Sequence, residues 1–403
     1  MTIEPELKSE DPNTTLQSEV EKKKRKRRML LLVALLILLL CLCVTSILLI
    51  VYLFERKPLP DLIPQPVNFN YAPHYLFSIY DIDQPVGVAL SPDGSRVYVA
   101  EMGGERLIKI FDREGKLIGS FAPPGTNFAQ RAPAYIAVSK DGRVFISDRL
   151  QFAIFIYDPD GNYLDSILAP GLSLSEYVSV HIGGLPAGTR YFYNTSSNLV
   201  QYRTPGNITQ TLPGPDPSEW SPLGLRFDRS DNLWVTSVNN QEQVVRSIPS
   251  DALRGASLNK FDYAELRFGS EGKKADQFSF PNMAIMDFQD RLHVLDGNNS
   301  RISVWDNQGN HLFLYGIGSG DSAVGLPRGG AIDNKDRLHV VDAVGQNVKV
   351  YDVSGVEPNY LFSFGEFGMD DGQFNYPNDI ALDLFGRLYI ADRENNRIQV
   401  WSY

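Results

Sequence analysis

Acidic residues recur along the chain at the end of one strand-like pattern, and three of them are followed five residues later by arginine. These pairs are Glu101 with Arg106, Asp296 with Arg301, and Asp392 with Arg397. A carboxylate beside a guanidinium can serve catalysis, but it can also hold a turn through charge-assisted hydrogen bonds. Because the pairs recur with the repeat itself, we interpret them as structural clasps and not as a catalytic group.

The histidines show no spacing typical of a catalytic or metal-binding cluster. His293 and His339 occupy a position that is aromatic in the other copies of the pattern, which indicates the packing of a flat ring. The sequence contains no nucleophile elbow, no metal-binding histidine pair on a helix and no phosphate loop. We therefore assign no catalytic residue and no metal ligand.

The pattern itself reads arginine, leucine, aromatic, apolar, small and acidic, as in residues 387–392. Copies end at intervals of 43 to 59 residues, which leaves room for four short strands in each unit. Repeats of this kind predict an all-β fold, a β-propeller of four-stranded blades, with seven blades by repeat count. The copies end at Glu101, Asp148, Asn194, Ser237, Asp296, Asp342 and Asp392.

The two ends of the repeat region are complementary. The last unit stops at Tyr403 after its third strand, whereas a surplus strand at residues 75–78 precedes the first unit. We expect this N-terminal strand to complete the last blade, because two sheet edges would otherwise stay unpaired. Deletion of residues 74–83 is therefore expected to open the ring.

The last three units resemble the NHL-repeat propellers. The resemblance is clearest from Phe364 to Val400, recurs from Phe268 to Pro281, and covers about residues 74–403. It is weakest over residues 177–216. Many NHL propellers have six blades, so six is the alternative count, which applies if the weak segment is not a blade.

Polar residues follow the opening proline in three consecutive units. They are Asn282, Arg328 and Asn378, with Asp379 beside the last. In a propeller these positions lie at the mouth of the central channel, so they form a candidate site for a ligand or partner. The alternative is that they are solvated loop residues. A second candidate surface is the expansion between Val238 and Phe268, where residues 249–253 carry a helix-start signal.

The N-terminal region predicts a membrane anchor. Residues 29–54 form an apolar stretch of 26 residues, long enough to span a bilayer, and seven basic residues directly precede it. We predict a single-pass signal-anchor helix, with residues 1–28 as a disordered cytoplasmic tail. A cleaved signal peptide is the rival interpretation. Prolines in residues 55–73 predict a stalk below an extracytoplasmic propeller at residues 74–403.

Charge and cysteine content limit the kinds of bond and partner that the propeller can have. Both cysteines lie in the predicted helix, so the propeller cannot form a disulfide. The chain carries a net charge of −10, and because residues 1–28 are net basic, the remainder is at −12. Such an acidic domain lacks the footprint of a nucleic-acid binder. We expect a partner among envelope or extracellular proteins.

These observations favour a membrane-anchored scaffold that binds a protein or a ligand. The resemblance also leaves an alternative from another class, because some propellers are hydrolases or lyases that gather a metal or a histidine–acid group at the channel. The sequence shows no cofactor motif, and a divalent cation bound in the channel remains open under that alternative. We therefore expect a binding function and not an enzyme.

Overall fold

In the computed structural model, the described residues are 12–55, 71–195, 197–215, 220–240, 242–253 and 266–403. The chain divides into two compact units, residues 1–62 and 63–403, which are described separately. Helix α1, Pro12–Glu55, makes up the described part of the first unit. Its segment Lys23–Ile47 is long and apolar enough to cross a membrane, which fits either an anchor or a signal sequence.

Helix α1 is longer than the sequence predicted. Residues 12–28 were expected to be disordered, but they are helical and continuous with the apolar segment. The physical reason is their composition: from Thr14 onward this segment is rich in Lys, Arg and Glu, which favour helix, and it contains no glycine or proline. Residues 1–11 and most of the predicted stalk lie outside the described residues.

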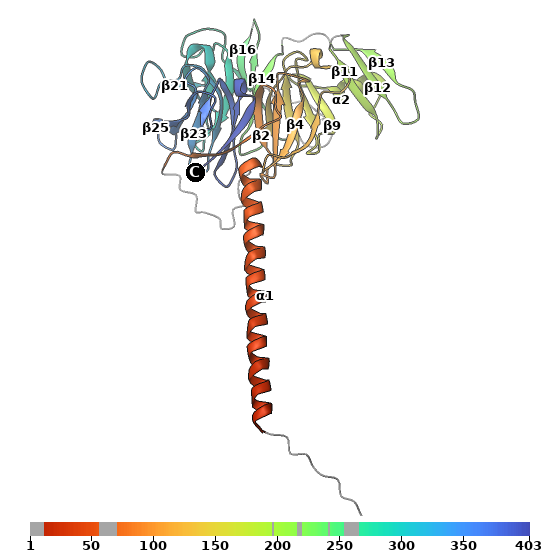
Figure 1. Ribbon diagram of the computed structural model, residues 1–403. Helices are drawn as coiled ribbons and strands as arrows, with labels where there is room; N and C mark the ends of the chain where they lie inside the picture. Colours follow the sequence, from red (N-terminus) through yellow and green to blue (C-terminus); the bar gives the residue numbers. More distant parts are fainter. Residues whose placement is uncertain (1–11, 56–70, 196, 216–219, 241, 254–265) are drawn as a thin grey trace, which may run out of the picture. The chain divides into compact units, whose positions relative to one another are not determined.

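The second unit is built from antiparallel sheets (Figure 1). In six of the described sheets, the first strand begins at an opening proline. The first sheet holds β2 Pro85–Leu90, β3 Arg96–Glu101, β4 Ile108–Asp112 and β5 Leu117–Phe121. The second holds β6 Pro133–Val138, β7 Val144–Asp148, β8 Ala153–Tyr157, β9 Tyr163–Ala169 and the short β10 Leu172–Ser173.

The third to fifth sheets follow the same plan. The third holds β14 Pro222–Phe227, β15 Leu233–Val238, β16 Gln243–Ile248 and β17 Leu266–Phe268. The fourth holds β18 Pro281–Met286, β19 Arg291–Asp296, β20 Arg301–Asp306 and β21 His311–Tyr315. The fifth holds β22 Pro327–Ile332, β23 Arg337–Asp342, β24 Asn347–Asp352 and β25 Asn359–Phe364.

The sixth sheet joins the two ends of the second unit. Strands β28 Pro377–Leu382, β29 Arg387–Asp392 and β30 Arg397–Ser402 are completed by β1 His74–Ile79, which pairs antiparallel with β30. This is the pairing that the sequence predicted. Short elements lie in the connections: η1 Phe128–Gln130, η2 Gly297–Asn299, η3 Arg393–Asn395, and the parallel pair β26 Glu366–Phe367 and β27 Gln373–Phe374.

The inner strands lie around a common centre. Strand β2 lies beside β6, β6 beside β14, β14 beside β18, β18 beside β22, β22 beside β28, and β28 beside β2. The described residues between 177 and 215 contribute no strand to this circuit, and the arrangement fits the alternative of six blades, not the seven that the repeat count predicted. The chain enters this segment through helix α2, Leu174–Ile182, instead of a strand.

Local signals explain why α2 forms where a strand was expected. The Ser173 side chain accepts a hydrogen bond from the Glu176 backbone and caps the start of the helix. Gly183, at φ 75°, ends it in the left-handed conformation. A three-stranded sheet follows, with β11 Arg190–Asn194, β12 Leu199–Arg203 and β13 Gln210–Pro213. We call α2 with this sheet the inserted module; Figure 1 shows it at the periphery of the propeller.

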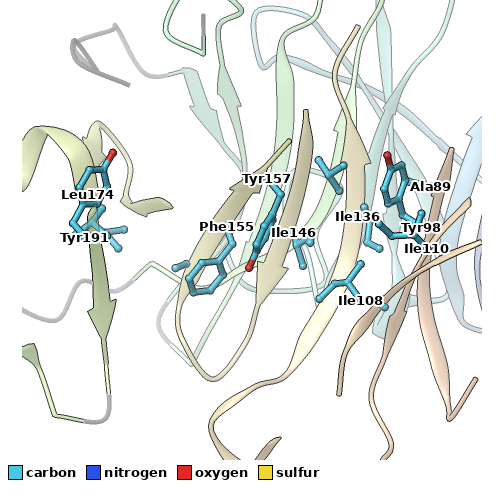
Figure 2. Packing of buried hydrophobic residues seen from close by; sticks show 14 of the residues in the cluster. Ala89, Tyr98, Ile108, Ile110, Ile136, Ile146, Phe155, Tyr157, Leu174 and Tyr191 are labelled. Carbon is cyan, nitrogen blue, oxygen red and sulfur yellow. The ribbon is translucent and has the colours of Figure 1, made fainter. Parts of the chain in front are cut away.

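The core lies between neighbouring blades. Figure 2 shows one such cluster, in which Tyr98, Ile136 and Tyr157 from the first two sheets pack together. The aromatic position of the repeat is buried throughout, since Tyr98, Phe145, Tyr191, Trp234, His293, His339 and Tyr389 are all at most 9% exposed. The expectation that this position packs a flat ring is confirmed.

We predict that packing of β1 into the core of the sixth sheet contributes to the stability of the fold. Ile79 in β1 is 1% exposed, whereas Ile118 in the outer strand β5 is 56% exposed. Ile79→Ala should cost about 2–5 kcal/mol of unfolding free energy, because it leaves a cavity in the core. Ile118→Ala is the matched control and should change it by less than about 0.5 kcal/mol. Equal effects in chemical denaturation of the full chain would show that β1 does not pack there.

Candidate functional site

The recurrent acids, each at the end of the second strand of a sheet, bind the backbone just before the first, inner strand of the same sheet. The backbone NH of Ser279 donates to Asp296 over 2.7 Å, and that of Asn375 donates to Asp392 over 2.8 Å. Each donor lies just before an opening proline. The same kind of bond reaches Glu101, Asp148 and Asp342. The acids therefore hold the start of each inner strand in place.

Two of the three predicted arginine pairs form. Arg301 Nε lies 2.8 Å from Asp296 Oδ2, and Arg397 Nε lies 2.8 Å from Asp392 Oδ2. Both arginines also donate to backbone carbonyls of the preceding loop, including that of Gln277 for Arg301. These buried, charge-assisted bonds fit the structural clasps that the sequence predicted.

The third predicted pair, Glu101 with Arg106, does not form. The Glu101 NH bonds to the Leu107 carbonyl, so this turn is one residue longer than the turn between Asp296 and Arg301. Arg106 consequently lies inside the turn at φ 53°, and its Nε donates to the Met102 carbonyl. Glu101 pairs instead with Lys109 Nζ at 2.7 Å. The change in turn length corrects the prediction for both residues.

The predicted polar sector divides into separate parts. Arg328 Nη1 donates to Asn282 Oδ1 over 3.0 Å, and Asn282 Nδ2 donates to the Pro327 carbonyl over 2.9 Å. Asn378 donates to the Val86 carbonyl and so links β28 to β2. Asp379 does not contact Arg328. Asn282, Asn378 and Asp379 are buried, whereas Arg328 is partly exposed.

Asp379 binds a residue that sequence reasoning missed, Arg226 of β14. Arg226 Nη2 lies 2.6 Å from Asp379 Oδ1. The same guanidinium donates to the carbonyls of Ile136 in β6, Gly330 in β22 and Ile380 in β28. Arg226 therefore connects inner strands of four blades across the centre of the ring. The sequence carries no signal for this contact, because Arg226 does not belong to the repeat pattern.

The environment of Asp379 combines full burial with this ion pair. Burial raises the pKa of Asp379 to about 6, while the Arg226 guanidinium and the Val88 amide act in the opposite direction. The second carboxylate oxygen accepts the Val88 NH over 3.0 Å, so both oxygens have donors. This ion pair therefore has a structural role, because it links strands of different blades.

The proline side of the channel carries a group of cations over aromatic rings. The guanidinium carbons of Arg149 and Arg328 lie 5.4 and 5.8 Å from the centre of the Phe280 ring. Those of Arg328 and Arg393 lie 5.8 and 5.5 Å from the centre of Tyr376. We call these five residues the arginine mouth. Sequence reasoning found Arg328 alone, because the others lie next to the repeat positions and not within them.

Electrostatics set the arginine mouth apart from the clasps. Burial lowers the pKa of Arg149, and the positive charge of Arg328 acts in the same direction. The Nε atom of Arg328 is buried without a hydrogen-bond partner among the described residues. Within the same residues, neither Arg149 nor Arg328 forms an ion pair. The mouth can therefore accept an anionic group.

The other end of the channel has a different character. A cavity of about 270 Å³ lies where the inner strands finish, and Arg226 contributes to its wall. Most of its lining is apolar, including Val88, Ile136 and Leu382.

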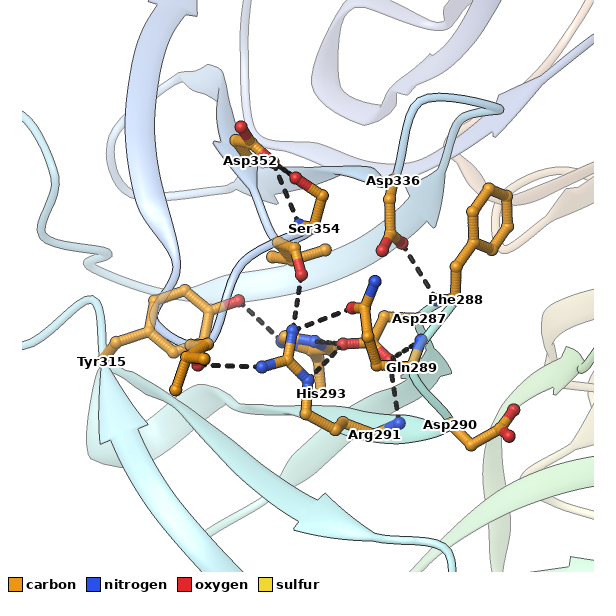
Figure 3. Close-up of polar contacts among 12 residues, drawn as sticks. Asp287, Phe288, Gln289, Asp290, Arg291, His293, Tyr315, Asp336, Asp352 and Ser354 are labelled. Atoms are coloured by element: carbon orange, nitrogen blue, oxygen red, sulfur yellow. Dashed lines mark hydrogen bonds and ion pairs between the residues drawn. The ribbon is translucent and has the colours of Figure 1, made fainter.

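The buried histidines belong to hydrogen-bond networks within the blades. In Figure 3, His293 lies between Asp287 and Tyr315, at 3.0 Å from the carboxylate and 2.9 Å from the hydroxyl. Arg291 Nε binds the same carboxylate at 2.6 Å. Burial lowers the pKa of His293, so the neutral ring donates from Nε2 to Asp287 and accepts from Tyr315 at Nδ1.

His339 occupies the equivalent position in the next blade. Its Nε2 lies 2.6 Å from the Tyr403 hydroxyl, and burial lowers its pKa to about 4. Among the described residues, no group of three or more His, Cys, Asp or Glu side chains is arranged to hold a metal ion. The two histidines therefore serve as hydrogen-bonding replacements for the aromatic residues of the other blades.

The second predicted surface, between Val238 and Phe268, is described only in part. Residues 250–253 form a turn and not the helix that their sequence indicated, and Leu253 is buried at 2% exposure. This side chain packs into the core between the second and third sheets. The remainder of the expansion, residues 254–265, lies outside the described residues.

Comparison with known proteins agrees with this geometry. Residues 374–401 match the NHL repeat family. The chain is 45% identical over 42 residues to human NHL repeat-containing protein 3, and 44% identical over 43 residues to the B-box type zinc finger protein ncl-1 of Caenorhabditis elegans. These matches cover 10% and 11% of this chain and 12% and 5% of the two relatives.

Solved structures show the fold over a longer range. Virginiamycin B lyase from Staphylococcus aureus superposes with a TM-score of 0.50 at 14% identity, covering 81% of this chain and 98% of the lyase. The protein is thus a β-propeller. Within that class it carries an NHL repeat, which forms its last blade, and an apolar helix near its N-terminus.

We predict that Arg226 and Asp379 stabilise the fold as a unit. Arg226→Met should cost about 3–5 kcal/mol of unfolding free energy, because it leaves a buried carboxylate without its cation. Adding Asp379→Asn should recover part of this loss, so the double variant should be more stable than the sum of the single effects implies. The exposed pair Arg229 and Asp290, at 3.3 Å, is the matched control and should show coupling below about 1 kcal/mol. Additive effects at the buried pair would contradict the interpretation.

We predict that His339 makes stability depend on pH. Its folded pKa of about 4 lies below the ordinary value of 6.5, so the unfolded chain takes up a proton first as the pH falls. Stability should therefore fall from pH 6.5 toward pH 4, by about 2 kcal/mol at pH 5. His339→Phe, with the residue found at this position in the second blade, should weaken this dependence.

The measurement for His339 is chemical denaturation of the full chain between pH 5 and pH 7. The exposed His74 supplies the control His74→Gln, which should keep the wild-type pH dependence. Identical pH profiles for wild type and His339→Phe would show that His339 is not the responsible group.

Proposed function

We propose that this protein is a membrane-anchored binding scaffold whose arginine mouth receives an acidic group of a partner protein. The observation that carries the proposal is the set of Arg149, Arg328 and Arg393 over Phe280 and Tyr376. Arginine presents a planar fork of donors that matches carboxylate geometry, and aromatic rings hold the fork in place. An acidic side chain would complete the mouth.

The charge balance supports this choice. The chain beyond residue 28 carries −12, yet the mouth concentrates arginines that lack carboxylate partners within the described residues, with the exception of Arg393 beside Glu394. A half-buried, unpaired cation is costly unless a ligand pairs with it. A nucleic acid is the less suitable partner, because the acidic remainder of the domain would repel its phosphates.

The channel itself favours binding over catalysis. Asp379, the acidic residue predicted for the channel, is already neutralised by Arg226 at 2.6 Å. A channel-centred metal-dependent hydrolase or lyase would need such a charge free to act on a substrate. Asn282 and Asn378 are also committed to strand-to-strand hydrogen bonds. The mouth above them is left as the surface for a partner.

The proposal includes the membrane. Within helix α1, the basic run Lys22–Arg28 directly precedes the apolar stretch, and a basic flank of this kind is retained in the cytoplasm. The propeller would then face outward from the cell membrane, where its partner would be another envelope or extracellular protein. The segment Lys23–Ile47, which is long and apolar enough to cross a membrane, supports the anchoring part of this proposal.

The test is quantitative crosslinking capture with the full-length protein from its native membranes. We expect Arg149→Gln with Arg328→Gln to reduce capture of the specific partner at least fivefold, because both forks are removed. Lys273→Gln with Lys274→Gln removes the same charge from two exposed side chains that do not belong to the mouth and should leave capture unchanged. Wild-type capture by the Arg149 and Arg328 variant, with its fold verified by circular dichroism, would refute the proposal.

A further inference from the structure

The inserted module encloses a cleft that the repeat pattern does not require. One face of its sheet carries Tyr193 and Val200, which pack with Leu174 and Val178 of α2. Figure 2 shows Leu174 and Tyr191 together on the module, apart from the labelled residues of the neighbouring blades. The opposite face of the sheet lines a cleft of about 990 Å³. Its other wall comes from the start of β9 and from the loop at 185–189.

Two arginines meet at the end of this sheet face. Arg190 of β11 and Arg203 of β12 are direct cross-strand partners, and both line the cleft. Like charges directly opposite each other destabilise a sheet. Neither arginine forms an ion pair among the described residues, and Arg203 makes one backbone contact, from Nε to the Asn207 carbonyl at 2.8 Å. Both side chains are exposed, so the two guanidinium groups are available to an anion in the cleft.

The next cross-strand pair continues the same face with Phe192 and Gln201. Both residues also line the cleft. A phenyl ring and an amide thus lie one step from the two guanidinium groups, because alternate residues of a strand face the same side. The lining contains no aspartate or glutamate among the described residues. The whole chain has 48 acidic and 38 basic residues, so this cleft differs from the rest of the chain in the sign of its charge.

We propose that the cleft is a binding site for an organic anion with a flat apolar body and one or two carboxylate, sulfate or phosphate groups. The anionic groups would pair with the forks of Arg190 and Arg203, which bind such groups in a bidentate manner. The flat body would lie against Phe192, and Gln201 would donate to or accept from its polar edge. A volume of about 990 Å³ is that of a small-molecule site.

This site is independent of the scaffold proposed above. The arginine mouth lies at the channel, on residues of the inner strands and their adjoining turns, whereas the cleft belongs to the inserted module and the second blade. A ligand in the cleft would require no partner at the mouth. Variants of one site therefore serve as controls for the other.

The test is isothermal titration of the detergent-solubilised full chain with naphthalene-1,5-disulfonate, against a detergent blank. The neutral control ligand is 1,5-bis(hydroxymethyl)naphthalene, which has the same ring system without the charges. We expect the disulfonate to bind at least tenfold more tightly than the neutral compound. Arg190→Gln with Arg203→Gln should reduce its affinity at least tenfold, while Arg149→Gln with Arg328→Gln should leave it unchanged.

A second variant tests the apolar part of the site. Phe192→Leu should weaken binding of the disulfonate about threefold or more. It should leave the affinity for inorganic sulfate unchanged, because in the proposed complex the ring contacts only the flat body of the ligand. Equal binding of the charged and neutral naphthalenes to the wild type would overturn the proposal. Equal losses in the cleft and mouth variants would also overturn it, since they would indicate attraction by overall charge. Failure of partner capture together with binding of the disulfonate would contradict the proposal for the arginine mouth and support the one for the cleft.

Discussion

The architecture depends on one partly buried arginine at the centre of the ring. Arg226 reaches from β14 to the carbonyls of Ile136, Gly330 and Ile380 and to the carboxylate of Asp379. Inner strands of different blades share few backbone hydrogen bonds, so a side chain that joins several of them fixes their spacing. The desolvation of this guanidinium is offset because its donors meet oxygen atoms on three sides. Arg226 therefore acts as a polar joint between the inner strands.

The inserted module arises where the chain departs from the repeat. Helix-capping residues at Ser173 and Gly183 convert the weakest copy of the pattern into α2, and the following strands form a sheet outside the ring. The ring loses nothing by this, because β6 and β14 then lie side by side. The module, freed from packing between two blades, can expose one face of its sheet. The like-charged pair Arg190 and Arg203 is tolerated on that face because it is open to the cleft.

The sequence predicted local contacts well and distant ones poorly. Asp296 with Arg301 lies within one hairpin, so five residues of spacing sufficed to predict the pair. The same spacing failed for Glu101 and Arg106, because one additional turn residue rotates Arg106 away from the carboxylate. Arg226 and Asp379 are 153 residues apart, and only the closed order of the inner strands brings them together. The propeller class was predictable from period and alternation, whereas the number of blades depended on whether α2 or a strand followed Ser173.

The distribution of arginine is the common thread between the fold and the two candidate sites. Three arginines that stabilise the propeller, Arg226, Arg301 and Arg397, each have a carboxylate within 2.8 Å. Arg149 and Arg328 of the mouth, like Arg190 and Arg203 of the cleft, lack ion-pair partners among the described residues. An acidic chain has carboxylates in excess, so their absence at these two places is not a matter of supply. The partly buried guanidinium groups of the mouth and the exposed ones of the cleft each present a fork of donors that matches an anionic group.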